Sequence, residues 1–275
     1  MPYSVLMSVY DKEDKNNFRA AVDSMINQTV APDDIVIVCD GPLTKELDEA
    51  VEYYEKTYGS LFTVLRLEKN MGLGVALHKG LLKCRNEIVA RMDADDISVP
   101  ERMEKELAVI ENNPSISVVG GQIAEFCEST ENIAGYRKVP TDENEIARMM
   151  KSRNPLNHVT TVFRKSDVIA VGNYSDLNGF EDYCLWARLY AGGKRLCNIE
   201  DVCCFVRIDK NTYHRRSGID YFKKTVEMEK ILRSSRIISS AQMAKNLTVR
   251  FVGTVLMPND IRGALFRRLM RRKQL

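Results

Sequence analysis

Three aspartates crowd into four residues at Asp93, Asp95 and Asp96, directly after a short apolar run. Carboxylates this close raise one another's pKa unless a cation lies among them. Carboxylate oxygens suit hard divalent ions such as Mg²⁺ and Mn²⁺, so one interpretation is a metal site. The other is a solvated turn before a helix, in which Ser98 and Glu101 form a capping box.

Acidic residues stand at two other positions where chemistry is possible. Asp40 ends an apolar run and precedes Gly-Pro. It could accept a hydrogen bond from the N3–H of uracil or from a ribose hydroxyl, or it could form an Asx-turn. Glu181 and Asp182 fall in the first turn of an expected helix, where the helix dipole favours acids whatever their role. The functional alternative is a general base that takes a proton from an attacking hydroxyl.

Glycines and cations supply further candidates. The glycines of the 70–74 segment, Asn-Met-Gly-Leu-Gly, would let backbone approach a ligand closely, or would form a simple left-handed turn at a helix start. His158, His214 and the pair Arg215 and Arg216 could contact an anion. A lone histidine or a surface arginine pair more often has a structural or solvated role.

These residues are placed by an alternation of strands and helices. Short apolar runs predict strands at 5–9, 35–39, 62–67, 88–92 and 116–119, and amphipathic stretches predict helices near 14–28, 44–58, 73–85, 100–113, 180–191 and 219–236. This rhythm predicts a mostly parallel sheet covered by helices, in which ligands bind beyond the carboxyl ends of the strands. The acidic strand ends would then share one rim. Neither G-x-G-x-x-G after the first strand nor G-x-x-x-x-G-K-[ST] occurs, which argues against a dinucleotide-binding domain and a P-loop NTPase.

Composition sets the broad class. The chain has 275 residues, of which 44% are hydrophobic and 28% charged, which is ordinary for a globular protein and excludes a disordered, collagen-like or disulfide-stapled chain. Seven cysteines without a C-x-x-C pair indicate buried reduced thiols. The sequence begins without a signal-peptide pattern, and no run of about 18 apolar residues occurs. A cytoplasmic location is therefore expected.

The near-neutral net charge of +2 conceals two unlike parts. Residues 1–206 hold 23 Lys and Arg against 33 Asp and Glu, a balance of −10, whereas residues 207–275 hold 17 against 5, a balance of +12. Residues 247–275 mix Leu, Val, Phe and Met with Arg at helical spacing, which predicts an interfacial helix on an anionic membrane. Nucleic-acid binding is disfavoured because stacking aromatics are scarce in this segment and no nucleic-acid motif is present. A solvated helix packed on the rest of the chain remains the alternative.

Taken together, these motifs resemble the family 2 glycosyltransferases, inverting enzymes with a GT-A fold that build bacterial surface polysaccharides. The resemblance covers about residues 3–210, with order and spacing kept. It runs through the segments 4–10, 24–29, 34–40, 70–80, 91–96 and 180–183.

The resemblance implies a role for each matched residue. The catalytic pair would be Asp182, as base, with Glu181, and the metal would be held by Asp95, Asp93 and His214. The nucleotide-sugar site would comprise Ser8, Val9, Tyr10, Asp40, Leu73, Lys79, Arg91, Asp93, Ala94, Arg215 and Arg216, with Asp40 facing the uracil. An Ala-Arg-Asn often follows Asn-x-Gly in the family, and Ala-Leu-His stands here, so Lys79, Arg91 or the Arg215–Arg216 pair would contact the diphosphate. The 213–218 segment resembles the loop that closes over the donor.

The implied activity is transfer of a sugar from a UDP-sugar to a hydroxyl of a lipid-linked saccharide, in O-antigen-like or capsule-like assembly. Mn²⁺ or Mg²⁺ would assist a single displacement, on the inner face of the plasma membrane. The expected division is a GT-A catalytic domain over 1–210, with a nucleotide-binding half (1–120) and an acceptor half (121–210). A donor loop and a basic amphipathic helical segment follow over 211–275. A nucleotidyltransferase and a non-catalytic sugar-nucleotide-binding protein are the competing interpretations.

Overall fold

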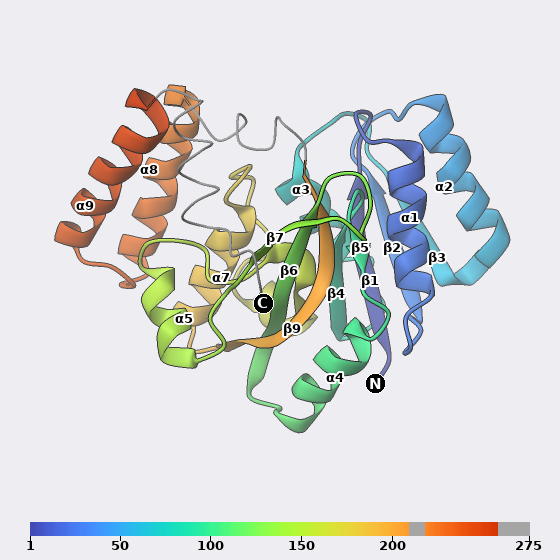
Figure 1. Cartoon of the computed structure of the whole chain (residues 1–275), viewed down its shortest axis with the longest axis horizontal. Helices are drawn as coiled ribbons and strands as arrows, with labels where there is room; N and C mark the ends of the chain where they lie inside the picture. Colours follow the sequence, from blue (N-terminus) through green and yellow to red (C-terminus); the bar gives the residue numbers. More distant parts are fainter. Residues whose placement is uncertain (209–217, 258–275) are drawn as a thin grey trace.

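One mixed sheet organises the molecule (Figure 1). The computed structural model describes residues 1–208 and 218–257, and within these ranges nine strands form the sheet. They are β1 (Tyr3–Val9), β2 (Asp34–Cys39), β3 (Phe62–Arg66), β4 (Ile88–Asp93), β5 (Ile97–Ser98), β6 (Ile116–Phe126), β7 (Ile133–Arg137), β8 (Val162–Arg164) and β9 (Arg195–Arg207). Their order is β3-β2-β1-β4-β8-β6-β9-β5, and β7 pairs with β6.

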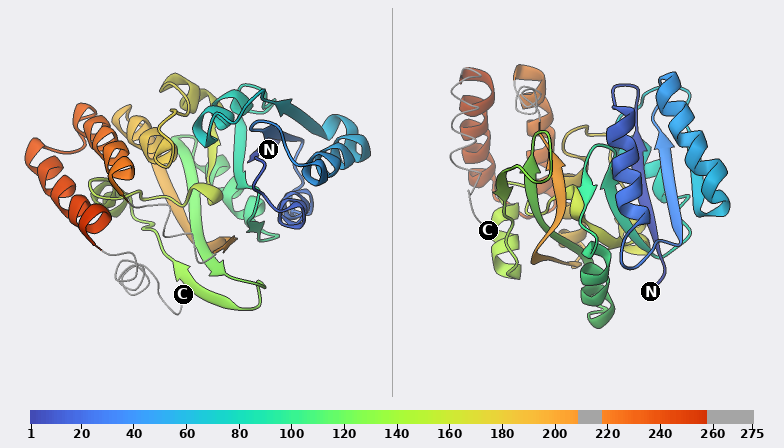
Figure 2. Two further views of the ribbon diagram at one scale, coloured as in Figure 1. Left: turned by 90° about the horizontal axis from the view of Figure 1, so that it is seen from above. Right: turned by 45° about the vertical axis from the view of Figure 1, so that its right-hand side comes forward.

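Helices cover both faces of this sheet (Figures 1 and 2). They are α1 (Lys15–Ile26), α2 (Lys45–Tyr58), α3 (Leu73–Leu81), α4 (Arg102–Asn112), α5 (Glu143–Met150), α6 (Lys165–Ala170), α7 (Glu181–Ala191), α8 (Gly218–Ser234) and α9 (Ser240–Phe251). Short turns of helix occupy Gly59–Leu61, His158–Thr160 and Val252–Leu256. The six helices expected from the sequence are all present, and the one expected near 73–85 already ends at Leu81.

Side chains that alternate between two buried faces explain why the central strands are mostly apolar. In β1, Val5 and Met7 face a core shared with α1, α2 and α4, whereas Leu6 faces a second core shared with α3, α5 and α7. A strand buried on both faces has no polar side to display, which is the pattern typical of parallel sheets between helix layers. The ladders β1–β2, β1–β4 and β2–β3 are indeed parallel, so the carboxyl ends of these four strands meet at one edge.

The second half of the sheet differs from the simple parallel expectation. β8 runs antiparallel to both β4 and β6, while β6 and β9 pair in parallel over their length with register shifts. The expected strand at 116–119 extends to Phe126 as β6. The capping box does not form, because Ser98 lies in β5 and Glu101 caps α4 without a side-chain hydrogen bond. The hydroxyl of Ser98 instead accepts a hydrogen bond from Gln28 Nε2 at 3.1 Å.

The two C-terminal helices form a hairpin at one end of the molecule (Figure 2). α8 packs against α7. Glu229 of α8 is fully buried, where its carboxylate accepts a hydrogen bond from Asn246 Nδ2 at 3.0 Å and lies 3.4 Å from Nε of Arg250. A buried carboxylate needs such partners, so this contact fixes α9 on α8. Among the described helices, none is long and apolar enough to cross a membrane.

Candidate active site

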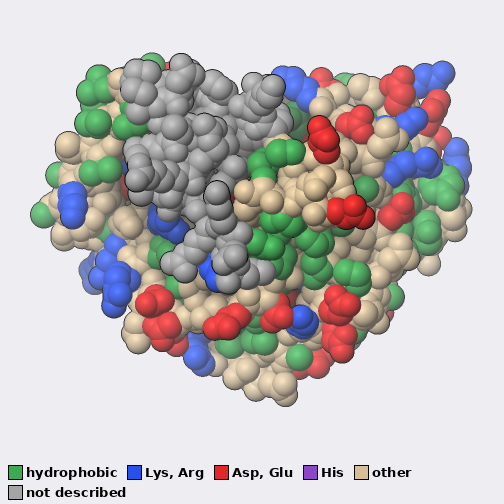
Figure 3. Space-filling model, viewed as in Figure 1, with side chains coloured by type: hydrophobic (Ala, Val, Ile, Leu, Met, Phe, Trp, Pro, Cys, Tyr) green, Lys and Arg blue, Asp and Glu red, His purple; other side chains and the backbone are tan. Residues whose placement is uncertain are grey.

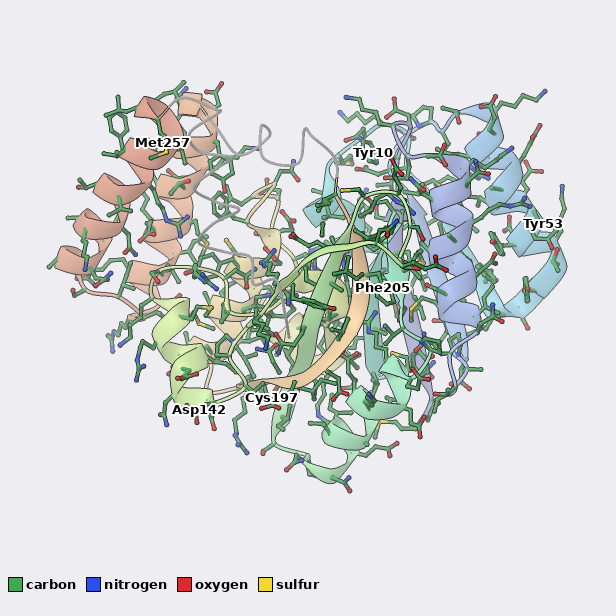
Figure 4. All side chains as sticks on the ribbon, viewed as in Figure 1. Tyr10, Tyr53, Asp142, Cys197, Phe205 and Met257 are labelled. Atoms are coloured by element: carbon green, nitrogen blue, oxygen red, sulfur yellow. The ribbon has the colours of Figure 1, made fainter. Side chains whose placement is uncertain are left out.

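The acidic strand ends predicted to share a rim do so. Tyr10, which follows β1, lies at the upper end of the sheet in Figure 4, and Cys197, near the start of β9, lies at its lower end. The carboxyl ends of β1, β2 and β4 therefore meet near Tyr10, and β9 rises toward the same edge. Val9 is buried, while Ser8 and Tyr10 are half-buried at the rim.

At the end of β4, the buried side chain of Arg91 forms an ion pair with Asp93. The guanidinium of Arg91 contacts both carboxylate oxygens of Asp93, and its side chain is only 2% exposed. A planar guanidinium matches a carboxylate in this two-pronged geometry, and the pairing offsets the cost of burying the charge. Arg91, expected as one of three candidates for the diphosphate, is thus placed beneath the rim, where it fixes Asp93.

The next two aspartates share a crowded negative environment. Burial, and after it the charge of Asp93, raises the pKa of Asp95 to about 6, with Arg91 acting in the opposite direction. Asp96 is buried, and burial together with Asp95 and Asp93 raises its pKa well above the ordinary value. Asp96 accepts a hydrogen bond from the backbone N–H of Arg207 at 2.8 Å. It therefore ties the acidic loop to the end of β9.

Arg207 completes this tie. Its Nε donates to the backbone carbonyl of Asp95 at 3.2 Å, and its guanidinium lies 4.6 Å from the ring centroid of Phe126. Nothing in the sequence pattern indicated this residue, because both of its side-chain contacts are formed with segments more than 80 residues away. The last residue of β9 thus positions the backbone that carries Asp95.

The carboxylates at the end of β4 suit a divalent ion whose remaining coordination positions are filled by a bound ligand. No cluster of three or more His, Cys, Asp or Glu side chains suited to hold a metal alone occurs in residues 1–208 and 218–257. Mg²⁺-type sites commonly use one or two carboxylates, with waters and substrate phosphates completing the shell. Asp95 offers an oxygen to such a set, and Asp93, both of whose oxygens already contact Arg91, could contribute only beside that contact. The charge of Asp93 raises the pKa of Asp95, and a bound cation would relieve that repulsion.

Asp40, for which the sequence allowed either a nucleoside contact or an Asx-turn, has a structural contact with a distant segment. It is buried, and its two carboxylate oxygens accept hydrogen bonds from the backbone N–H groups of Met71 at 2.7 Å and Gly72 at 2.9 Å. The acid at the end of β2 therefore holds the start of α3. A contact of Asp40 with uracil, as expected from the sequence, would have to form beside these two bonds.

The glycines at the start of α3 serve a close approach between chain segments. A Cβ on Gly72, whose φ is +88°, would overlap the side-chain amide of Asn178, and a Cβ on Gly74 would overlap the carbonyl oxygen of Ser175. The sequence suggested that these glycines let a ligand approach the backbone. The segment that approaches them is instead the 175–178 loop, which leads into α7 and its two acids.

Gly74→Ala is accordingly expected to destabilise the fold. Within a helix, replacing glycine by alanine ordinarily stabilises by up to about 1 kcal/mol. Here the added methyl meets backbone, so we expect a loss of about 2 kcal/mol in the free energy of unfolding, measured by urea titration. Gly253→Ala is the matched control, because a Cβ there has no atom within 4 Å. Equal midpoints for the two variants would contradict the packing argument.

The acids at the start of α7 differ in environment. Glu181 is buried and its Oε2 accepts from the backbone N–H of Gly179 at 2.5 Å. Burial, followed by the charge of Asp182, raises the pKa of Glu181 to about 7. Asp182 is half-buried, and its carboxylate accepts hydrogen bonds from Asn154 Nδ2 at 2.6 Å and from the backbone N–H of Tyr183 at 2.7 Å. Asp182 is thus the more exposed acid.

The remaining candidates are placed as follows. Ala94 is buried, Leu73 is half-buried at the first position of α3, and Lys79 is exposed on α3 with Nζ 3.8 Å from Met71 Sδ. Burial and the charge of Arg91 hold the pKa of His158 well below its ordinary value, and Nε2 of this ring lies 3.1 Å from the Tyr174 hydroxyl, so His158 has a structural role. His214, Arg215 and Arg216 lie outside the described residues.

Comparison with known proteins identifies the family. The model of glycosyl transferase family 2 matches residues 4–172. The chain belongs to glycosyl transferase family 2. This glycosyltransferase is 38% identical over 272 residues to an uncharacterized glycosyltransferase of Haemophilus influenzae, covering 99% of this chain and 100% of the other. It is 36% identical over 229 residues to the amylovoran biosynthesis glycosyltransferase AmsE of Erwinia amylovora, covering 83% and 85%.

A third relative has a specific name. The glycosyltransferase is 32% identical over 270 residues to the UDP-Gal:alpha-D-GlcNAc-diphosphoundecaprenol beta-1,3-galactosyltransferase of Escherichia coli, covering 98% of this chain and 97% of that one. The crystal structure of S. aureus TarS 1-349 in complex with UDP-GlcNAc superposes with a TM-score of 0.70 at 17% identity, covering 98% of this chain and 76% of that one. That likeness shows the fold, so the expected GT-A architecture is confirmed.

Proposed function

We propose that this glycosyltransferase moves a sugar, with inversion, from a UDP-sugar to a hydroxyl of a lipid-diphosphate-linked saccharide during surface polysaccharide assembly. Two relatives that match most of the chain are named for amylovoran biosynthesis and for galactosyl transfer to a diphosphoundecaprenol acceptor. The fold is shared with a structure that holds UDP-GlcNAc. These names support the classes of donor and acceptor.

The observation that carries the proposal is the acidic loop at the end of β4, in which buried Arg91 contacts Asp93 and Asp95 follows. At the start of α7, Asn154 Nδ2 and the backbone N–H of Tyr183 donate hydrogen bonds to the carboxylate of Asp182. An acidic loop for the diphosphate side and a half-buried carboxylate, Asp182, for the acceptor side are the two parts that the proposed reaction requires.

Asp95 and Asp93 are the residues that would hold Mn²⁺ or Mg²⁺, with His214 as a further candidate. A bound divalent ion would offset the charge that develops on the leaving diphosphate. A mannosyltransferase from Pyrobaculum calidifontis solved with GDP-Man and Mn²⁺ shares the fold, with a TM-score of 0.61 and 15% identity over 97% of this chain and 79% of that one.

Asp182 would accept the proton of the acceptor hydroxyl as the oxygen attacks the anomeric carbon. The proton passes to a carboxylate oxygen, the new C–O bond forms, and the bond to the diphosphate oxygen breaks from the opposite face. A hydroxyl is a poor nucleophile at neutral pH, so removing its proton lowers the barrier. Holding both substrates in line supplies a further share.

We propose that residues 1–120 bind the nucleotide and residues 121–210 the acceptor. In this division Ser8, Val9, Tyr10 and Asp40 form the nucleoside side of the pocket, together with Leu73 and Ala94. Lys79, the exposed candidate on α3, and the Arg215–Arg216 pair would reach the diphosphate. Residues 211–275 would supply the donor loop and the membrane contact.

The membrane contact is supported by the described end of the chain. Val249, Val252 and Leu256 are 64%, 45% and 62% exposed and are spaced to form one stripe. Met257, which follows them, lies in Figure 4 at the same upper level of the molecule as Tyr10. Figure 3 shows basic side chains on the side of the molecule where α8, α9 and α5 lie. An apolar stripe flanked by basic residues suits an anionic bilayer.

Replacing Val252 and Leu256 together by Asp is expected to lower binding to phosphatidylglycerol vesicles about tenfold, because two apolar side chains lose their burial in lipid. Co-sedimentation measures the bound fraction. Leu82→Asp is the matched control, since Leu82 is exposed but belongs to the segment after α3. Unchanged binding of the double variant would rule out this stripe.

A donor panel tests the activity. The protein, Mn²⁺ and an undecaprenyl-diphosphate-linked sugar are incubated with UDP-, GDP- and dTDP-sugars, and nucleotide release is measured. We expect acceptor-dependent release of UDP. Release of pyrophosphate from a nucleoside triphosphate and sugar phosphate would indicate a nucleotidyltransferase instead. Donor binding without turnover on any acceptor would indicate a non-catalytic sugar-nucleotide-binding protein.

A further inference from the structure

Asn154 lies against the carboxylate of Asp182, from a part of the chain that no motif singles out. Its Nδ2 donates to Asp182 Oδ2 at 2.6 Å, and the two residues are 28 positions apart. Hydrogen bonds to an ionised carboxylate are among the stronger ones in proteins. The contact both orients the carboxylate and favours its charged form.

The amide of Asn154 is itself held in this orientation. Its Oδ1 accepts a hydrogen bond from the backbone N–H of Leu156 at 3.1 Å, so the oxygen is engaged within its own loop and the nitrogen faces Asp182. Leu156 is fully buried in the core that also contains Tyr183. A short polar side chain fixed at its oxygen has little freedom to turn away, which makes Asn154 a rigid donor.

The loop that carries Asn154 is fastened at its other end by α9. Asn246 Nδ2 donates to the backbone carbonyl of Lys151 at 2.8 Å, and a guanidinium nitrogen of Arg250 donates to the carbonyl of Ser152 at 2.6 Å. The same two side chains contact Glu229, which is fully buried in α8. The C-terminal helix pair therefore holds the backbone at Lys151 and Ser152, two to three residues before Asn154.

A second bond ties this region to α7. The hydroxyl of Tyr183 donates to the backbone carbonyl of Met150 at 2.5 Å. Residues 150–154 thus contact α7 through Tyr183 and Asp182, and contact α9 through Asn246 and Arg250. The loop is clamped between the helix with the acid and the helix pair at the C-terminus.

We propose that Asn154 is a positioning residue for the base Asp182, and that Asn246 and Arg250 of α9 fix the loop from which it acts. The inference rests on the proposed role of Asp182. It gives the C-terminal helices a catalytic task that is separate from membrane contact, because the clamp uses the side of α9 that faces the rest of the protein.

The decisive variant is Asn154→Asp, which keeps the size of the side chain and replaces the donor by a carboxylate. Other charged or titratable groups near Asp182 are Glu181, Tyr174, Tyr183 and Cys184, with Arg91 acting on Glu181. All of them are retained in the variant. A new negative charge beside Asp182 favours the protonated form of Asp182. In a plot of kcat against pH, the fall in kcat at low pH is therefore expected to begin at a higher pH.

At pH 7 we expect kcat of Asn154→Asp to fall about 10- to 100-fold, while KM for the UDP-sugar stays within about twofold. Asn154→Ala, which adds no charge, is expected to lower kcat about tenfold and to shift the fall at low pH less. Asn132→Asp is the matched control, because Asn132 lies in an exposed turn. Thermal unfolding and UDP binding establish that each variant is folded.

Asn246→Ala and Arg250→Ala test the clamp. Each removes one hydrogen bond to the 151–152 backbone, and we expect kcat to fall about threefold in either variant with KM for the donor unchanged. Vesicle binding of Asn246→Ala is expected to equal that of the wild type. A wild-type pH profile and kcat in folded Asn154→Asp would overturn the positioning role. If Asp182→Asn were itself fully active, the proposed base would fail first, and the two failures are thereby distinguished.

Discussion

Asp182→Asn is expected to lower kcat about 10³-fold while leaving the affinity for the UDP-sugar unchanged. The variant keeps the shape of the side chain and an oxygen that can accept from the backbone N–H of Tyr183, so the start of α7 is preserved. It removes the carboxylate proposed to take the proton of the acceptor hydroxyl. Initial rates of UDP release, with donor binding measured by calorimetry, separate the chemical step from binding.

Glu181→Gln is the matched control for this variant. Glu181 is buried and accepts from the backbone N–H of Gly179, and a glutamine oxygen can take over that bond. Because a buried acid with a pKa of about 7 is largely uncharged below neutral pH, the neutral amide resembles its protonated state. We expect less than a tenfold fall in kcat. Near wild-type turnover of Asp182→Asn would remove Asp182 as the base.

Asp95→Ala is expected to abolish the metal-dependent part of donor binding. In the wild type, Mn²⁺ should raise the affinity for UDP, since Asp93 and Asp95 would hold the ion and its positive charge would favour binding of the diphosphate. The variant should lose about 100-fold in affinity for UDP in the presence of Mn²⁺ and should bind equally with and without the ion. Titration of UDP with and without Mn²⁺ measures the difference.

Asp201→Asn controls for the loss of a negative charge elsewhere. Asp201 pairs with Lys105 on an exposed part of β9, where an ion pair contributes little to stability. It should retain the full response to Mn²⁺. If Asp95→Ala retained that response as well, the metal would have to be held by other residues, and Asp95 would be excluded from the site.

Local pattern was enough to predict the first half of the fold and its rim. The runs at 5–9, 35–39 and 88–92 are mostly apolar on both faces, with Arg91 as the charged exception, and are separated by helices with one apolar side. Their pairing as a covered parallel sheet follows from this burial. Asp93 and Asp95 could be predicted as rim residues for the same reason, because each stands directly at or after a strand end.

The remainder depends on contacts between distant segments, which leave no periodic signal. β5 has two residues and exists only because it pairs with β9, more than 100 positions later. Arg207 and Asn154 are isolated polar residues whose roles depend on contacts with distant segments, the loop of Asp95 and Asp96 in one case and the carboxylate of Asp182 in the other. For Gly72, a left-handed backbone was expected as one alternative, but its neighbour Asn178 could not be inferred from spacing.

The seam, which is the close contact between α3 and the 175–178 loop, limits which segments can be exchanged between related enzymes. Gly72 and Gly74 allow this contact only without side chains, and Asn178 and Ser175 fill the space left by the missing Cβ atoms. A chimaeric enzyme that exchanges residues 121–210, the proposed acceptor half, would join surfaces shaped by different parents at this point. Such a hybrid should take both sides of the seam from one parent, and acceptor specificity is therefore better exchanged through the loops outside it.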